Sequence, residues 1–314
     1  MTKQQLEGVL AVMKPAGWTS HDVVAKVRRL VGVRRIGHTG TLDPQVTGVL
    51  PLCIGRATRM VEYIQELPKQ YEATVVIGLA TDTEDLSGTV LERVNEVTIS
   101  EADIRSAISS FLGEIEQVPP MYSAVKVDGK RLYELARKGE QVERKARKVT
   151  IHEFELLDMR LDESLPEFSF RVTCSKGTYI RTLCVDIGRK LGFPAAMKEL
   201  IRTRTGNLSL DDCLTLEQIA ELSANGTLAE RLIPADQAIG HLPILHLSEK
   251  QAVQAAQGQR IRLQAEAELN EVADQAIVRV YDRQENFVGL FQWNEGNRIL
   301  APHKIFSEPP TSSV

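Results

Sequence analysis

A polar stretch near the amino terminus is the part of the chain best suited to chemistry: Gly37-His38-Thr39-Gly40-Thr41-Leu42-Asp43-Pro44. Its single carboxylate, Asp43, precedes a proline, which steers the backbone away from helix towards an extended or turn conformation. The two glycines permit close backbone approaches that a side chain would block. Asp43 on such a rigid turn is a candidate nucleophile or general base. The alternative is a capped turn in which Asp43 accepts hydrogen bonds from nearby backbone N–H groups.

A second polar turn offers a partner for that carboxylate: Ser175-Lys176-Gly177-Thr178-Tyr179-Ile180-Arg181-Thr182. Arg181 can form a bidentate pair that orients a carboxylate, and Asp43 and Asp85 are the candidates. The alternative is a structural or phosphate-binding arginine.

Aromatic residues add a possible binding surface for a nucleobase. Tyr71 and Tyr179 could stack on a splayed base, as single-stranded RNA is commonly read, or they could belong to the core. His38 could carry a proton or merely contact backbone or phosphate. The sequence contains no Walker A motif, dinucleotide fingerprint, HExxH or GxSxG.

Composition restricts the class of protein. The chain has 314 residues, 43% of them hydrophobic, which fits one large domain with a small one, or two domains. The start MTKQQLEGVL does not resemble a signal peptide, and no run approaches the roughly 18 apolar residues of a membrane span. The four cysteines form no CxxC pair, which argues against zinc and against a disulfide framework. We therefore expect reduced thiols and a cytoplasmic location.

Charge is unevenly distributed, although the formal net charge is only −4. Residues 14–59 carry eight Lys or Arg and two acids, residues 126–148 carry nine and four, and residues 171–206 carry eight and two. Any one window could be a solvated basic helix face. Three such windows in an acidic protein, each coinciding with a motif, favour a site for nucleic acid.

The elements that must position these residues follow from periodicity. We expect a strand at 9–13, a helix capped by Ser20 and ended by Gly32, a strand at 49–55 and a helix at 56–67. Pro51 predicts that the second strand lies near a sheet edge. A strand at 71–79, a return strand at 90–94 and a helix from Ser100 to Leu112 follow.

The second half continues the alternation. Residues 118–148 contain a strand, an Asp-Gly turn and a short basic helix, which predicts a basic protrusion suited to gripping phosphates. Strands at 149–160 and 167–175, a helix that Gly192 ends and a basic strand at 199–206 come next. Residues 215–240 look helical and connecting. The composition shifts at about Pro243 to a short helix and several strands, so we expect domains at 1–240 and 241–314.

These motifs together resemble the TruB family of pseudouridine synthases, which modifies uridine-55 in the T-loop of tRNA. The resemblance rests on GHTGTLDP at 37–44, KPAGWTS at 14–20 and CSKGTYIRT at 174–182. It continues through GVLP at 48–51, KQY at 69–71, TDT at 81–83 and PPMYSA at 119–124. The part after 240 resembles a small PUA-like RNA-binding domain.

The resemblance implies an α+β fold with a mixed, mostly antiparallel central sheet and flanking helices, followed by the β-rich PUA-like domain. It implies that the uracil–ribose N1–C1′ bond breaks, the base turns over, and C5 rejoins C1′. No cofactor or metal is expected, because the isomerisation is redox-neutral and uses no external nucleophile. The expected partner is the T-stem-loop of tRNA, with no membrane involved, and nothing requires more than a monomer.

The resemblance also assigns residue roles. Asp43 would be catalytic, either adding to C1′ or first removing a sugar proton; His38 would fill the gap left by the flipped base. Tyr71 would stack on that base, and a pocket lined by Tyr179, Arg181 and Leu200 would surround it, with Arg181 pairing to Asp43 and also to Asp85. Lys14 would support the catalytic loop, and residues 119–148 would form a thumb over the T-loop.

Two other classes of function compete with this assignment. One is a catalytically silent tRNA-binding or RNA-chaperone protein, against which the intact Asp43, Arg181 and Tyr71 argue. The other is a nucleoside or glycoside hydrolase, which needs a second carboxylate in the pocket.

Overall fold

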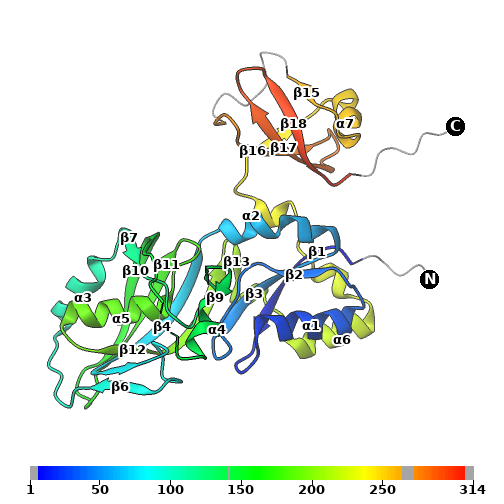
Figure 1. The fold of residues 1–314 in the computed structure, drawn as a ribbon. Coiled ribbons are helices and arrows are strands. Elements are labelled where there is room, and N and C mark those ends of the chain that lie inside the picture. Colours follow the sequence, from blue (N-terminus) through cyan, green and yellow to red (C-terminus); the bar gives the residue numbers. More distant parts are fainter. Residues whose placement is uncertain (1–5, 141, 264–271, 308–314) are drawn as a thin grey trace.

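Two β-sheets dominate the computed structural model, which describes residues 6–140, 142–263 and 272–307 (Figure 1). The larger sheet has nine strands, and its main path runs β1-β3-β12-β4-β11-β10-β7. Every pairing in it is antiparallel except β3 with β12. The expected mixed, mostly antiparallel sheet is therefore confirmed. In path order, its strands are β1 (Gly8–Lys14), β3 (Thr47–Ile54), β12 (Ala195–Thr205), β4 (Lys69–Ile77), β11 (Glu167–Cys174), β10 (Arg147–Arg160) and β7 (Gly113–Gln117), with β2 (Ile36–His38) beside β3 and β13 (Leu208–Ser209) beside β12.

Helices pack on the two ends of this sheet (Figure 1). Helices α1 (Ser20–Val31) and α6 (Leu216–Asn225) lie side by side over the β1–β3 end, around Val23, Val27 and Ile219. Helices α3 (Glu101–Ser109) and α5 (Ile180–Leu191) cover the other half and bury Phe170 and Leu183. Among the described residues, no helix is long and apolar enough to cross a membrane.

The first helix begins one residue away from the predicted position. Its N-cap is Thr19, which forms a capping box with Asp22, rather than Ser20. The Ser20 hydroxyl accepts a hydrogen bond from the Leu42 N–H at 2.9 Å instead. The expected C-cap is confirmed, because Gly32 ends the helix with φ +68°. This shift ties the start of α1 to the loop that carries Asp43.

Pro51 lies near a sheet edge, as predicted, because its strand is next to the edge strand β1. Strand β3 lies inside the sheet, with β1 on one side and β12 and β2 on the other. The Pro51 carbonyl accepts from the Thr39 N–H at 3.1 Å, just past the end of β2. In a strand, the nitrogen and the carbonyl of one residue point to the same neighbouring strand. The Pro51 nitrogen therefore points to where β2 has ended and the loop begins, so the lack of an N–H costs no hydrogen bond of the ladder.

Short elements project from the main sheet or connect its parts. Strands β5 (Leu79–Thr81) and β6 (Val90–Arg93) form the predicted hairpin. Strands β8 (Lys126–Val127) and β9 (Lys130–Arg131) turn at Asp128-Gly129 and lead into α4 (Leu132–Ala136). The remaining helical segments are η1 (Gly55–Met60), α2 (Val61–Glu66), η2 (Leu210–Asp212), η3 (Leu228–Arg231) and η4 (Gln237–Ile239).

The smaller sheet follows residue 243, as the shift in composition indicated. It has five strands in the order β14-β16-β17-β18-β15, with α7 packed beside them. Buried Arg279 ties this unit to the preceding segment by donating to the carbonyls of Asp236, Gly240 and Leu242. The elements are β14 (Ile244–His246), α7 (Glu249–Ala256), β15 (Ile261–Arg262), β16 (Ile277–Tyr281), β17 (Phe287–Asn294) and β18 (Ile299–Ile305).

Candidate active site

Asp43 lies in the loop between β2 and β3, and buried side chains fix the position of this loop. Leu42 is 4% exposed and anchors the loop in the core. The fully buried Lys14 ammonium donates to the carbonyls of Pro15, Pro44 and Val46 at 2.7–3.0 Å. Lys14 therefore supports this loop, as the resemblance implied.

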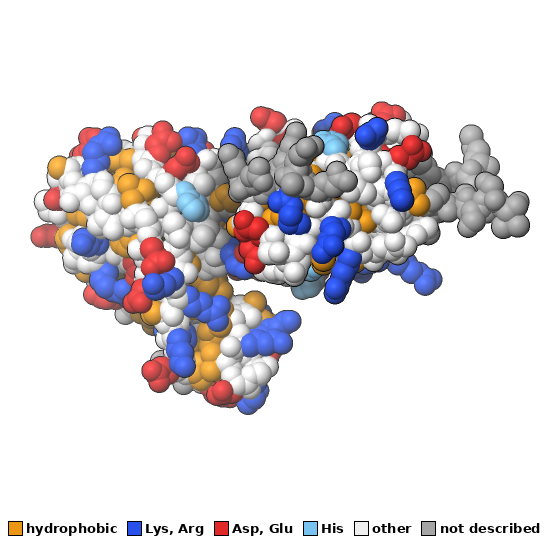
Figure 2. All heavy atoms as spheres, turned by 90° about the horizontal axis from the view of Figure 1, so that it is seen from above, with side chains coloured by type: hydrophobic (Ala, Val, Ile, Leu, Met, Phe, Trp, Pro, Cys, Tyr) orange, Lys and Arg blue, Asp and Glu red, His pale blue; other side chains and the backbone are white. Residues whose placement is uncertain are grey.

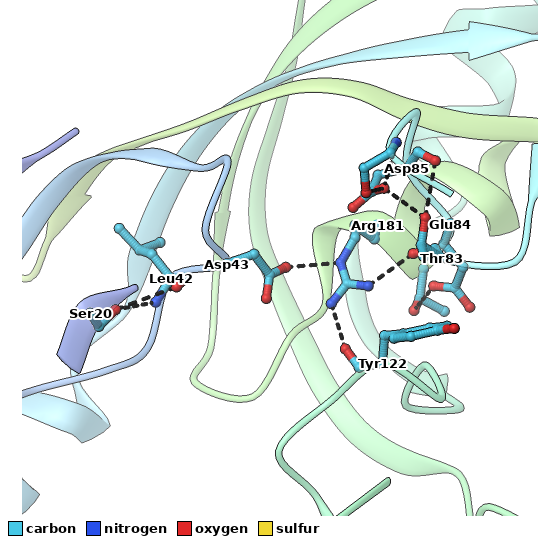
Figure 3. Close-up of polar contacts among 10 residues, drawn as sticks. Ser20, Leu42, Asp43, Thr83, Glu84, Asp85, Tyr122 and Arg181 are labelled. Carbon is cyan, nitrogen blue, oxygen red and sulfur yellow. Dashed lines mark hydrogen bonds and ion pairs between the residues drawn. The ribbon is translucent and has the colours of Figure 1, made fainter. Parts of the chain in front are cut away.

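Asp43 meets Arg181 across the site. The Asp43 Oδ2 lies 2.9 Å from the Arg181 Nε (Figure 3). The Asp43 side chain is 44% exposed, whereas that of Arg181 is 5% exposed. The carboxylate is thus oriented from the protein side and open on the solvent side.

Arg181 also joins two other segments to the Asp43 loop. It lies in the first turn of α5, and its two remaining nitrogens donate to the Thr83 carbonyl at 2.9 Å and the Tyr122 carbonyl at 2.8 Å (Figure 3). Three of its donors are therefore used in one rigid fork. The Asp43 loop, the turn after β5 and the start of the 119–148 segment therefore converge on one side chain.

Asp85 does not pair with Arg181, contrary to the second expected pairing. Its carboxylate accepts hydrogen bonds from the Thr83 hydroxyl at 2.7 Å and from the Ser87 N–H at 2.9 Å. This is the bonding of an acidic residue that closes its own turn. Asp85 therefore contributes to the site by shaping this turn. The Thr83 carbonyl of the same turn accepts a hydrogen bond from Arg181.

The two tyrosines lie within electrostatic range of Asp43. Burial raises the pKa of Tyr71, and the charges of Cys174 and Asp43 add to that increase, whereas Arg202 opposes it. Burial likewise raises the pKa of Tyr179, with a smaller contribution from Asp43 in the same direction. Gln117 fixes the backbone of Tyr179 through both its carbonyl and its N–H. Both phenols are therefore neutral near pH 7.

Leu200 and His38 lie on two other strands of the same sheet. Leu200 pairs with Ala73 in the β12–β4 ladder and packs against the core that contains Phe170. His38 ends β2, stacks edge-on against His21 with centroids 5.3 Å apart, and accepts from the Gly40 N–H through Nδ1. Burial lowers the pKa of His38, and His21 lowers it further, so the ring is neutral near pH 7.

Arg202 is a site residue that sequence reasoning missed. It is 2% exposed, and its guanidinium donates to the carbonyls of Val49 and Gly40. A usable signal was present: Arg202 lies two residues after Leu200, so in a strand both side chains point to the same face. Tyr122 and Thr83 contribute only backbone carbonyls and carry no such signal.

No cluster of three or more His, Cys, Asp or Glu suited to a metal ion occurs in residues 6–140, 142–263 and 272–307. The polar groups around Asp43 are instead hydrogen-bond donors: a guanidinium, an ammonium held in the loop, and two phenols. Such a set can orient a carboxylate and enclose a planar ring.

The buried lysine gives the site a pH-dependent contribution to stability. Burial lowers the pKa of Lys14 to about 8, with Asp43 opposing the decrease, against 10.5 when unfolded. Between these values the unfolded chain binds a proton that the folded chain lacks, so folding stability from Lys14 rises with pH. We expect the free energy of unfolding of the wild type, relative to Lys14→Met, to increase from pH 8 to pH 10 by about 1 kcal/mol per pH unit. Urea titrations at these two pH values measure it, and a pH-independent difference would contradict the lowered pKa.

Family models match three consecutive stretches of the chain. Residues 28–180 match the TruB family pseudouridylate synthase N-terminal domain. Residues 181–240 match the tRNA pseudouridylate synthase B C-terminal domain, and residues 243–305 match the pseudouridine synthase II TruB C-terminal model.

Whole-chain relatives agree with these matches. A tRNA pseudouridine synthase B of Geobacillus thermodenitrificans is 52% identical over 96% of this chain and 100% of its own length. The protein of the same name from Bacillus cytotoxicus is 47% identical over 96% and 97%. A crystal structure of a Cbf5-Nop10-Gar1 complex has a chain that is 26% identical, with a TM-score of 0.75, over 97% of this chain and 86% of its own.

Proposed function

This chain belongs to the TruB family of pseudouridine synthases, and we propose that it isomerises uridine-55 in the T-loop of tRNA to pseudouridine with Asp43 as the catalytic residue. The observation that carries this proposal is the Asp43–Arg181 pair. The buried guanidinium orients the carboxylate, which is open to solvent. A nucleotide that has left the base stack can approach such a carboxylate with its glycosidic bond exposed.

The reaction moves one bond and one proton. The N1–C1′ bond breaks with its electron pair left on N1, the uracil turns over, and C5 bonds to C1′. C5 then loses its proton to solvent and N1 takes one up, so the product is an isomer of uridine. Asp43 either adds to C1′ and leaves again, or removes a sugar proton and returns it; in both routes the carboxylate ends as it began. Arg181 would keep the carboxylate oriented through a charge-assisted hydrogen bond.

The surrounding side chains would hold the flipped uridine. Tyr71 would stack on the uracil, Tyr179 and Leu200 would complete the walls of the pocket, and His38 would occupy the space that the base vacates. Neutral rings suit this role, since stacking on uracil needs a π face and no charge. Lys14 would keep the loop rigid, and Asp85 would keep the acidic turn in shape for Arg181.

Basic surface would bind the surrounding tRNA phosphates. Figure 2 shows Lys and Arg side chains spread in separate groups over the face in view, with Asp and Glu between them. We assign residues 1–240 to catalysis, with 119–148 as a thumb, and 241–314 to a PUA-like RNA-binding domain. The family models, which divide between 240 and 243, support this boundary.

The chemistry bears on cofactor, assembly and location. An isomerisation that is redox-neutral and uses no external nucleophile asks for no metal or cofactor. We propose a monomer, since one chain supplies every residue named above. tRNA modification also implies a cytoplasmic location, which suits the four free cysteines.

The test is tritium release from a T-stem-loop transcript labelled at uracil C5. A synthase releases the C5 tritium and keeps the base on the RNA. A nucleoside hydrolase would release free uracil, and a silent RNA-binding protein would bind the transcript and release neither.

The thumb yields a separate prediction about RNA affinity. Replacing Arg137, Lys138, Arg144 and Lys145 with Ala should weaken T-stem-loop binding, because each side chain that neutralises a phosphate also releases a counterion. The slope of log K against log salt should become shallower by about 1 for each phosphate that is no longer neutralised. Fluorescence titrations between about 50 and 200 mM salt, a range over which such affinities change by orders of magnitude, measure the slope.

A matched control separates this effect from total charge. Arg93, Arg105, Arg160 and Arg231 are exposed and lie outside the three basic windows. Their replacement with Ala removes the same charge and should leave the salt slope unchanged. Equal slopes for the two quadruple variants would remove the thumb from the binding surface.

A further inference from the structure

A single buried guanidinium links the loop of Asp43 to the strand of Tyr71. Arg202 lies on β12 and is among the largest fully buried side chains. Its Nε donates to the Val49 carbonyl at 2.7 Å, and its Nη2 donates to the Gly40 carbonyl at 3.3 Å. Gly40 is three residues before Asp43, so Arg202 grips the catalytic loop from inside the protein.

The same guanidinium reaches Tyr71. Arg202 and Tyr71 are direct partners in the β12–β4 ladder, so their side chains project to the same face of the sheet. The Arg202 guanidinium also opposes the increase in the pKa of Tyr71 that burial causes, as a positive charge beside the phenol does. One side chain thus holds the loop of the proposed catalytic carboxylate and lies beside the ring proposed to stack on the uracil.

The backbone at Arg202 is also fixed in place. A Cβ on Gly48 would lie 2.2 Å from the Arg202 carbonyl oxygen, and Gly48 has φ +110°. Only glycine permits β3 and β12 to approach this closely. The position of the guanidinium is therefore determined by two strands as well as by its hydrogen bonds.

The charge of Arg202 is costly where it lies. Among the described residues, none of the ion pairs involves Arg202, and the hydrogen bonds of its guanidinium go to backbone carbonyls. Two further buried cations, Lys14 and Lys69, lie close enough for Arg202 to lower the pKa of each. Burying an unpaired charge beside like charges is strongly unfavourable unless hydrogen bonds compensate it. A core arginine in such surroundings calls for a role that an apolar side chain could not fill.

We propose that Arg202 is a positioning residue for the isomerisation: it sets the Asp43 loop and the Tyr71 ring at a fixed distance, so that carboxylate and ring engage the same nucleotide. This inference rests on the function proposed above. A planar guanidinium suits the role because its fixed fork reaches the Val49 and Gly40 carbonyls together while its charge lies beside Tyr71, a geometry that the ammonium of a lysine does not reproduce.

The first experiment compares Arg202→Lys and Arg202→Met with wild type by single-turnover tritium release and by T-stem-loop binding. We expect the rate to fall by about 10- to 100-fold, as a displacement on the order of 1 Å does at an active site. The dissociation constant should stay within about threefold, because Arg202 is buried and touches no RNA. Arg160→Lys and Arg160→Met, on the exposed edge of β10, are the controls and should match wild type.

The second experiment tests the link to Tyr71 by a double-mutant cycle with Tyr71→Phe, built on Arg202→Lys. If Arg202 acts partly through the Tyr71 phenol, the double variant should be less impaired than the product of the two single losses, by about fivefold or more. A residue that only stabilises the fold would give multiplicative losses and lower the melting temperature of every Arg202 variant alike. If Arg202→Met fails to fold, Arg202→Lys still decides the question.

The outcomes separate this inference from the proposed function. Wild type that releases no tritium would overturn the proposed function and this inference with it. If wild type is active, three results would overturn this inference alone. They are a wild-type rate for Arg202→Lys, equal losses of rate and RNA affinity in the Arg202 variants, and multiplicative rate losses in the cycle with Tyr71→Phe. A rate loss at constant affinity, coupled to Tyr71→Phe, supports it.

Discussion

Asp43→Asn should reduce tritium release by at least about 10⁴-fold while T-stem-loop affinity stays within about threefold. The amide keeps the shape of the carboxylate but can neither add to C1′ nor accept a sugar proton. Binding should survive because the contacts that hold the RNA lie elsewhere, on basic surface and aromatic rings. Single-turnover tritium release and a binding titration on the same preparation measure both quantities.

The control for this variant is Asp158→Asn, which makes the same exchange on the exposed part of β10. It should turn over at the wild-type rate. The Asp43→Asn melting temperature should lie close to that of wild type, since the Asp43 side chain is nearly half exposed. Turnover by Asp43→Asn near the wild-type rate would disprove the assignment of Asp43.

Arg181→Met should produce the second largest loss, about 10²- to 10³-fold in rate. The variant leaves Asp43 without the group that aims it, and it frees the Thr83 and Tyr122 carbonyls that Arg181 holds. Because hydrogen bonds from a charged donor contribute about 1.5–3 kcal/mol each, the free energy of unfolding should also fall by a few kcal/mol. Urea unfolding and tritium release measure the two effects.

A conservative variant and a double variant identify the cause. Arg181→Lys keeps the charge but lacks the fixed planar fork that reaches Asp43, Thr83 and Tyr122 from three nitrogens, so its rate should lie between those of wild type and Arg181→Met. Asp43→Asn combined with Arg181→Met should be no slower than Asp43→Asn alone, since Arg181 acts through the carboxylate. A further loss in the double variant would show that Arg181 has a separate function in the reaction.

Much of the site followed from local sequence. The Asp43-Pro44 turn, the two glycines of the loop and the Gly32 helix end are set by backbone preferences of the residues themselves. The pairing of Asp43 with Arg181 was one of the two candidate pairings for this arginine, and it is the one that forms. The same locality explains why the hairpins and the capped helix after Ser100 were predicted correctly.

Tertiary structure decided the features in which a residue has an alternative hydrogen-bond partner or neighbour that its local sequence does not reveal. Thr19 rather than Ser20 caps α1, because the Ser20 hydroxyl is bonded to Leu42. Pro51 is tolerated inside the sheet because β2 ends beside it. Asp85 does not reach Arg181, because hydrogen bonds within its own turn occupy its carboxylate.

The sequence by itself therefore determined which residues can do chemistry, and the tertiary structure determined what holds them. Three of the main supports of the site are backbone carbonyls: those of Thr83 and Tyr122 for Arg181, and that of Gly40 for Arg202. Every residue carries a carbonyl, so no side chain marks in advance which one will be used. Only the packing of β12 against β3 and β4 brings the Arg202 guanidinium between the loop of Asp43 and the ring of Tyr71.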